Sequence, residues 1–331
     1  MPGRLVVFDT TTGRLGAGRP DGSAFTPFAG PAFPANFAVA SPDGRRVVVG
    51  GAQVVDLDAG REQVRPHRLS SGDESALGQQ PFADHGSRVV LSSTAPGDLG
   101  GLLSVDLDGG SRHTLGGDAG GAAGDPTRNG AVVAVQGSTE VNLGPYTERD
   151  TSRVELRAWH RPTTTLATTA QLLKDAGLPA GKPYVVSPTV SSDGRLVALR
   201  IDELTANANS VTAKHAVVVV DRSGRVVASR GSFVSAAPVW SGDSTRLAWL
   251  DDQGVVLVRI TGDRAATSSV PGRVSGQSCL FSPTGAQLLC DDRTTGERFI
   301  VTLASEQVDQ VTFDPQRLAV AWLPAPGGGA G

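Results

Sequence analysis

The sequence predicts an all-β protein, a single β-propeller of seven four-stranded blades. The first observation is a short phrase that recurs along the chain: an apolar or aromatic residue, then Ser-Pro-Asp-Gly or a variant, then a run of apolar residues. The second is its spacing of about 41 to 66 residues, with matched points near residues 40, 81, 124, 190, 240, 281 and 322. The third is a later apolar run in each unit that ends in Asp and a turn.

The recurrent phrase marks a turn that joins two strands. Its clearest copies are Ala40–Gly44, Ser191–Gly194 and Trp240–Asp243. Weaker copies follow the same order of residue types at Phe82–Gly86, Asp125–Gly130, Phe281–Gly285 and Trp322–Gly327. Because such a repeat is the signature of stacked units, the whole chain is expected to form one ring.

The later apolar run of each unit is expected to be its third strand. Examples are Val54–Gly60, Leu103–Gly110 and Val218–Gly224, in which an Asp and a Gly follow the apolar residues. Positive φ is easily reached by Gly, Asn and Asp, so these runs are expected to end in hairpin turns. The repetition of Asp56, Asp106 and Asp221 favours turn chemistry over acid–base catalysis.

The two ends of the chain are expected to share the last blade. Leu5–Leu15 copies the third-strand phrase, and Leu318–Leu323 has the pattern of an inner strand. Their pairing would close the ring, with a second strand that is absent or supplied by residues 1–4. Residues 1–323 are therefore expected to form the propeller, and 324–331 a disordered Gly/Pro-rich tail. A start inside a blade is compatible with an upstream signal peptide, membrane anchor or second domain.

These phrases resemble the repeats of TolB-like propellers, relatives of the WD-repeat group, in which Ser-Pro-Asp-Gly marks the hairpin between the first two strands of a blade. The resemblance covers nearly the whole chain and implies the fold. It implies less about function, because such propellers serve as binding platforms, as accessory domains of peptidases, or as hydrolases and lyases.

Composition narrows the classes of function. The net charge is −3 and no block of like charge occurs, so nucleic-acid binding is not expected. No apolar stretch approaches the roughly 18 residues of a transmembrane helix. Basic residues are nearly all Arg, and Gly, Ala and Val are abundant, which favours a bacterial source with a GC-rich genome, such as an actinobacterium.

The two cysteines flank the turn at 282–285. If Phe281 faces Leu288 across this hairpin, the same register puts Cys279 opposite Cys290, within reach of a disulfide. A disulfide indicates an oxidising, extracytoplasmic location. The alternative is two buried free thiols. A zinc site is disfavoured, because no nearby Cys or His completes four ligands.

Three segments lengthen the repeat: 138–153, 168–187 and 202–215. By propeller topology all three emerge on one face, over the third and fourth blades. The chain's two Tyr and three Lys fall in these segments, as expected of an interaction surface, although drift in loop length is the alternative. Residues 169–177 are expected to form a short helix whose Leu172 and Leu173 pack on the propeller. The candidate contact residues are Tyr146, Glu148, Arg149, Lys174, Lys182, Tyr184, Asp202, Lys214 and His215.

Catalytic interpretations have weaker support. No Gly-x-Ser-x-Gly, His-Glu-x-x-His or phosphate-loop motif occurs. Acidic residues of the inserted segments are expected to be solvated rather than to bind calcium. Trp240, Phe281 and Trp322 are expected to fill the wedges between blades rather than to form a ligand cage.

The sequence thus predicts a non-enzymatic, cofactor-free propeller that binds a protein, peptide or envelope ligand outside the cytoplasm. The alternatives are a propeller hydrolase or lyase, with a metal or an acid–base pair at the central channel, and the sensor domain of a membrane protein.

Overall fold

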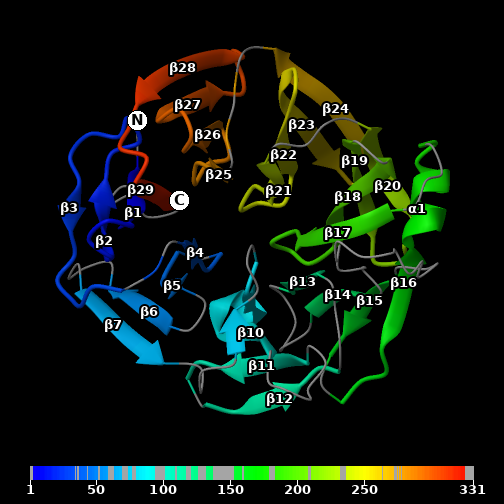
Figure 1. Ribbon diagram of the computed structural model, residues 1–331, viewed down its shortest axis with the longest axis horizontal. Helices are drawn as coiled ribbons and strands as arrows, with labels where there is room; N and C mark the ends of the chain where they lie inside the picture. The colour runs from blue at the N-terminus through cyan, green and yellow to red at the C-terminus, as the bar shows by residue number, and fades with distance from the viewer. Residues whose placement is uncertain are drawn as a thin grey trace.

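Seven antiparallel sheets stand around a common axis in the computed structural model, and they form a seven-bladed β-propeller (Figure 1). The predicted fold class is confirmed. The structure describes residues 3–33, 35, 37–42, 44–50, 53–58, 63–68, 74–76, 80–93, 101–108, 110–116, 121–125, 132–136, 153–158, 160–178, 183–207, 210–231, 236–262, 264–271, 274, 276 and 278–324. Residues 325–331 of the expected tail lie outside these ranges.

Six blades use consecutive strands, which run in chain order from the inner to the outer edge of each sheet. Blade 1 contains β4 (Ala38–Ala40), β5 (Arg46–Val49), β6 (Gln53–Asp58) and β7 (Gln63–Arg68). Blade 2 has a divided inner strand and contains β8 (Glu74–Ala76), β9 (Phe82–Ala83), β10 (Arg88–Ser93), β11 (Leu102–Asp106) and β12 (Arg112–Thr114). Blade 3 contains β13 (Gly121–Gly124), β14 (Val132–Gln136), β15 (Arg153–Arg157) and β16 (Thr164–Thr168).

The next three blades follow the same order. Blade 4 contains β17 (Pro183–Val190), β18 (Leu196–Asn207), β19 (Ser210–Asp221) and β20 (Val226–Gly231). Blade 5 contains β21 (Ala236–Trp240), β22 (Arg246–Asp251), β23 (Gly254–Thr261) and β24 (Arg264–Pro271). Blade 6 contains β25 (Ser278–Phe281), β26 (Gln287–Asp292), β27 (Glu297–Thr302) and β28 (Gln307–Thr312). The described helices are the 3-10 helix η1 (Asp84–Gly86) and α1 (Thr169–Asp175).

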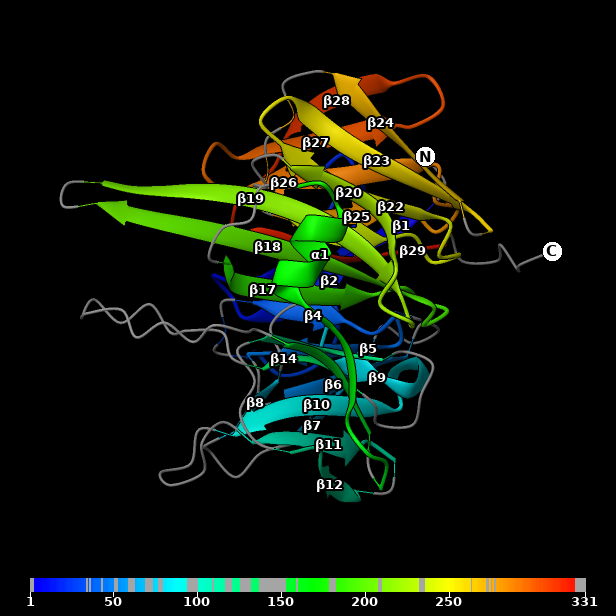
Figure 2. The same ribbon diagram turned by 90° about the vertical axis from the view of Figure 1, so that its right-hand side faces the viewer.

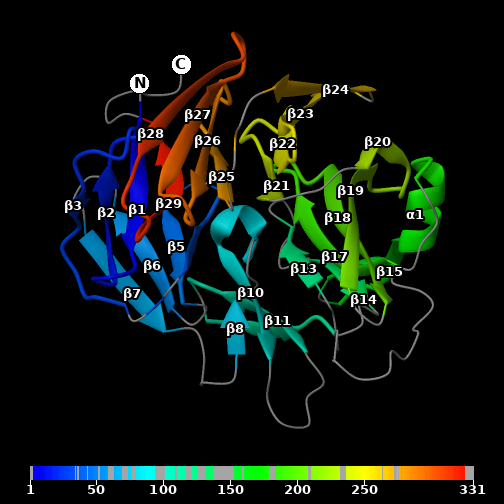
Figure 3. The same cartoon turned by 45° about the horizontal axis from the view of Figure 1, so that its top comes forward.

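Blade 7 closes the ring with both ends of the chain, as predicted (Figure 3). Its inner strand is β29 (Arg317–Leu323), and β1 (Arg4–Asp9), β2 (Arg14–Gly18) and β3 (Thr26–Pro27) follow outward. The prediction that the first apolar run is a third strand is wrong. That run, β1, is the second strand and pairs directly with β29, so no strand is missing.

Local turn chemistry explains this error. The hairpin after β1 is held by the Asp9 carboxylate, which accepts hydrogen bonds from the Thr11 and Thr12 N–H groups. In the same way, Asp221 accepts from the Ser223 and Arg225 N–H groups, between the third and fourth strands of blade 4. An Asp-closed hairpin therefore occurs at two different places in a blade, and the sequence alone does not distinguish them.

Among the described residues, the core consists of seven apolar clusters, one at each interface between neighbouring blades. Middle strands are buried on both faces, which is why they read as continuous apolar runs. In β5, Val47 and Val49 face blade 7 while Val48 faces blade 2. Trp322 is buried between blades 6 and 7, and Trp240 and Phe281 pack at the edges of other clusters, in agreement with their predicted packing role.

The recurrent turn joins the first strand of a blade to its second. In blade 1 the Ser41 hydroxyl accepts a hydrogen bond from the N–H of Arg46, and Gly44 adopts a φ of 67°. The same serine contact recurs from Leu196 to Ser191, from Arg246 to Ser241 and from Gln287 to Ser282. Serine at the first position and a residue of positive φ at the fourth are thus the parts of the phrase that the backbone requires.

Candidate functional site

The two faces of the ring carry different connections. We call the face with the Ser-Pro-Asp-Gly turns (around 41–44, 191–194 and 282–285) the turn face. We call the opposite face, with the second-to-third strand hairpins (around 251–254, 292–297 and 207–210) and the connections between blades, the loop face. The described parts of the three lengthened segments belong to the loop face, over blades 3 and 4 as expected.

The third lengthened segment is a strand hairpin rather than a loop. Strands β18 and β19 are 12 residues each, and only residues 208 and 209 separate them. Figure 2 shows this hairpin extending beyond the neighbouring strands. Strand β17 pairs with β18 only as far as Glu203, and β20 pairs with β19 only as far as Ala216. Beyond those points, Leu204–Asn207 and Ser210–Ala213 pair with each other, and we call these residues the ribbon.

Helix α1 lies at the base of the same face and confirms the predicted helix. The Thr168 hydroxyl accepts a hydrogen bond from the Gln171 N–H at the N-terminus, and Gly177 follows the helix with a φ of 66°. Leu172 and Leu173 are buried against blades 3 and 4, as expected, because they are the apolar side of the helix. Lys174 is exposed.

The structure places part of the predicted contact set. Asp202 lies opposite His215 in the β18–β19 register, and Glu203 lies opposite Lys214. Tyr184 belongs to the first strand of blade 4, β17, rather than to a loop, because that strand begins at Pro183. His215 is half-buried. The remaining candidates, Tyr146, Glu148, Arg149 and Lys182, lie outside the described residues.

A side-chain amide occupies the inner edge of the ring at blade 4. The Gln80 Nε2 group donates to the Val190 carbonyl at 2.8 Å, and Gln80 Oε1 accepts from the Val190 N–H at 2.7 Å. The Gln80 carbonyl accepts from the Gly124 N–H at 2.8 Å. One residue of blade 2 thus binds the inner strands of blades 3 and 4, on the edge that faces the central axis. Nothing in the local sequence marks this role.

The cysteines form the predicted bond. Cys279 lies opposite Cys290 in the β25–β26 register, Phe281 lies opposite Leu288, and the two sulfur atoms are bonded. Both cysteines are buried in the cluster between blades 5 and 6. The disulfide therefore ties the inner strand of blade 6 to its second strand.

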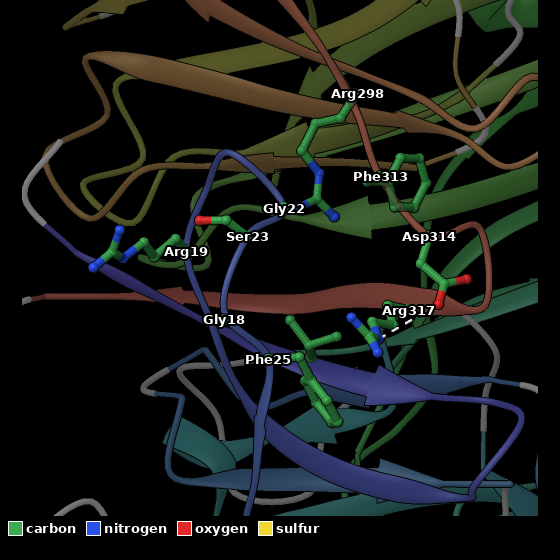
Figure 4. A pocket seen from close by; sticks show the side chains of 10 residues that line it. Gly18, Arg19, Gly22, Ser23, Phe25, Arg298, Phe313, Asp314 and Arg317 are labelled. Atoms are coloured by element: carbon green, nitrogen blue, oxygen red, sulfur yellow. Dashed lines mark ion pairs between the residues drawn. The ribbon is translucent and has the colours of Figure 1, made fainter.

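A pocket that the sequence did not predict lies at the junction of blades 6 and 7 (Figure 4). It encloses about 250 Å³, open solvent included, and Arg19, Phe25, Arg298, Phe313, Asp314 and Arg317 are among its lining residues. The Arg298 guanidinium lies 4.7 Å from the Phe313 ring centre, and that of Arg317 lies 4.9 Å from Phe25. These residues come from separate segments of the chain, so no local pattern could have grouped them.

Hydrogen bonds lower the pKa of several carboxyl groups, mainly on the turn face. Burial raises the pKa of Asp193, but hydrogen bonds from Arg195 and Ser191 outweigh it and leave the pKa below its ordinary value. The pKa of Asp243 is lowered in the same way, where burial is outweighed by hydrogen bonds from Ser241 and Thr245. These shifts belong to repeated turns, so they indicate structural rather than catalytic carboxylates.

Within the described ranges, no group of three or more His, Cys, Asp or Glu side chains is placed to hold a metal ion. Over the same part of the chain, no helix combines the length and hydropathy needed to span a membrane.

Comparison with known proteins identifies the fold. No protein-family model matches the chain, and no curated protein matches its sequence. An oligogalacturonate lyase solved with manganese has a TM-score of 0.59 and 12% identity, over 91% of this chain and 83% of the lyase. The Cps50 (Swd1) β-propeller domain of Myceliophteria thermophila has a TM-score of 0.53 and 13% identity, over 95% and 88% of the two chains. TolB from Acinetobacter baumannii also matches, with a TM-score of 0.44 and 12% identity, over 87% and 65%.

The predicted resemblance to TolB-like and WD-repeat-like propellers is thus confirmed for the fold, on the sheet topology and the match to the Cps50 (Swd1) propeller. The neighbours include a β-propeller domain and a lyase, and at these identities they show architecture alone.

Proposed function

We propose that this protein is a non-enzymatic β-propeller that acts outside the cytoplasm and binds a protein, peptide or envelope ligand through its loop face. The observation that carries this proposal is the β18–β19 hairpin, which extends past both neighbouring strands of its blade and past the body of the ring (Figure 2). Strand length beyond the sheet contributes little to the packed core. Such a projection on a rigid scaffold is typical of a recognition element.

The surroundings of the hairpin support a binding role. Lys174 on α1 is exposed on the same face, while the leucines beside it anchor the helix to blades 3 and 4. An anchored helix holds its exposed residues in a fixed position, which lowers the entropy lost on binding. The register also gathers three candidate contact residues, Asp202, Lys214 and His215, at the base of the ribbon.

The inner edge of blade 4 favours a binding scaffold rather than an enzyme with its active site in the central channel. Both polar groups of the Gln80 amide bond to the backbone of Val190. A reactive funnel would direct polar side chains toward a substrate, whereas this amide joins blades. The extracytoplasmic location is supported by the Cys279–Cys290 disulfide, because such bonds persist mainly in oxidising compartments.

A site-specific crosslinking experiment tests the binding face. A photoreactive amino acid is placed at Lys174 on the loop face or, as a control, at the exposed Ala286 on the turn face. Each protein is irradiated with the cell-envelope fraction of the source organism. We expect a discrete adduct from position 174 that excess unlabelled protein abolishes, and none from position 286. An adduct from position 286 alone, or from neither position, contradicts the proposal.

The tyrosines supply a second test once the adduct is identified. Replacement of Tyr146 and Tyr184 by Ala should weaken binding of that ligand about tenfold or more and leave the melting temperature nearly unchanged. A large fall in melting temperature would instead assign these two side chains to the core.

A further inference from the structure

The backbone of the ribbon has a defined direction of hydrogen bonding. The N–H of Asp221 donates to the Arg225 carbonyl, toward β20 and away from β18. Because an antiparallel strand alternates the side to which successive residues bond, Val211 and Ala213 direct their N–H and C=O groups to that same side. On the other strand, the Leu196 carbonyl accepts from Ser191 on the β17 side, so Ala206 is directed away from β19.

Strand β20 does not reach the ribbon. It ends at Gly231, opposite Ala216. Among the described strands, none pairs with the outer edge of Ser210–Lys214. A strand edge with open backbone groups is a template for another strand, and natural proteins protect such edges with bulges, prolines, charged side chains or a covering helix or loop. The register shows no bulge between β18 and β19, and the segment contains no proline and a single charged residue, Lys214.

We propose that this edge of β19 pairs antiparallel with the same edge of a second copy of the chain. The two-fold axis passes through Thr212, so Val211 of one copy faces Ala213 of the other, and Ser210 faces Lys214. The outward N–H and C=O groups of Val211 and Ala213 then bond across the axis, and β18 and β19 of both copies form one four-stranded sheet.

The edge is complementary to itself in this register. Each Lys214 lies opposite a Ser210, so the cations are at opposite ends and no like charges face each other. At the centre Thr212 faces its own copy, and threonine pairs are favourable cross-strand neighbours. A two-stranded ribbon is marginally stable in water, and four strands relieve that weakness. A two-fold axis is also the commonest symmetry of soluble oligomers.

Proline substitutions test whether the outer edge of β19 forms the contact between the two copies. Ala213→Pro removes an N–H that points toward the second copy, while the matched control Ala206→Pro removes one that points outward from β18. Neither N–H bonds within the hairpin, so both variants should retain the circular dichroism and melting temperature of the parent protein. In sedimentation equilibrium we expect the parent and Ala206→Pro to be dimers, and Ala213→Pro to associate at least about tenfold more weakly. A monomeric parent at about 100 µM, or a dimer that Ala213→Pro leaves intact, overturns the proposal.

A crosslink tests the register. Facing residues at a non-hydrogen-bonded position are about 4.5 Å apart at Cα, within disulfide reach. Thr212→Cys should therefore give a covalent dimer on mild oxidation, which a reductant reverses. Thr205→Cys, opposite Thr212 on β18, lies one strand further from the axis in each copy and should remain monomeric on the same gel. Equal crosslinking of the two variants, or none from Thr212→Cys, would contradict the two-fold pairing.

Discussion

Arg298 and Asp291 form a buried, two-pronged ion pair at the seam where the ring closes. Arg298 Nε lies 2.6 Å from Asp291 Oδ1, and Nη2 lies 2.9 Å from Oδ2. Both side chains are almost inaccessible, at 2% and 1% exposure. The third guanidinium nitrogen donates to the Pro20 carbonyl, and Asp291 accepts from the Ala319 N–H. A pair within blade 6 thus binds both terminal segments of blade 7.

Removal of one member of this pair should be severely destabilising. Arg298→Ala leaves the Asp291 carboxylate buried without its counter-charge, and such losses cost about 3–5 kcal/mol. Arg195→Ala is the matched control, because its ion pair with Asp193 is exposed and its loss should cost under about 1 kcal/mol. Urea unfolding measures both values. Equal effects of the two variants would contradict the role of the seam.

A double variant separates the effect of the buried charges on stability from the effect of side-chain packing. Arg298→Met with Asp291→Leu removes both charges and keeps most of the volume, so it should be more stable than Arg298→Ala. If the double variant is as unstable as Arg298→Ala, the bonds to Pro20 and Ala319 matter more than the buried charge.

The disulfide should be complete in protein isolated from its native compartment. Denatured, unreduced protein should show no free thiol by mass spectrometry, and two free thiols would remove the main support for an extracytoplasmic location. Reduction, or replacement of both cysteines by Ala, should lower the free energy of unfolding by about 2–3 kcal/mol, because the bond closes a loop between residues 11 apart in sequence.

Two glycines with similar backbone conformations should differ in how well they tolerate substitution by Ala. Gly110 and Gly224 lie in third-to-fourth strand hairpins, with φ of 68° and 84°. A Cβ at Gly110 meets nothing within 4 Å, whereas one at Gly224 collides with the Leu166 carbonyl of blade 3. Gly110→Ala should cost about 1 kcal/mol from backbone strain alone, and Gly224→Ala about 2–4 kcal/mol. Thermal unfolding of the two variants decides this, and equal losses would mean that the blades shift freely.

Asp221 should make stability depend on pH. Burial raises its pKa, but hydrogen bonds from Ser223 and Arg225 outweigh this and lower it to about 2 in the folded chain. A lowered folded pKa stabilises the fold above the unfolded pKa of roughly 4, and this contribution disappears as pH falls toward 2. Asp221→Asn should therefore lose about 1 kcal/mol at pH 7, after allowance for solvent screening, and almost nothing near pH 2. A loss that is constant over this range would contradict a charge effect.

Local chemistry determined which features the sequence could predict. Four of the turns were predictable because a serine hydroxyl and a residue of positive φ stand at fixed positions in each. The Cys279–Cys290 pair was predictable because one register relation, Phe281 with Leu288, fixes its neighbours. The place of β1 as the second strand of blade 7 was not predictable, since it depends on pairing with a strand at the other end of the chain.

The candidate site was predictable only in outline. Unequal spacing located the lengthened segments, yet nothing in Asp202–His215 indicates that both strands continue to residues 207 and 210. The contact of Gln80 with Val190 joins residues 110 apart in sequence, so no local pattern reveals it. Of the nine predicted contact residues, those on the hairpin are brought together by register, and their role in binding stays a prediction.

The closure of blade 7 determines the order in which the blades can form during synthesis. Thr10 donates to Gln316, 306 residues later, and β1 has no inner partner until β29 has been made. Blades 1 to 6 draw their strands from consecutive segments and can form as the chain emerges, but β1 to β3 must wait for β29. Until β29 has been made, the nascent chain therefore carries an open sheet edge. A holding chaperone, or export before folding, would protect that edge, and a chain truncated before β29 should aggregate rather than fold to a six-bladed ring.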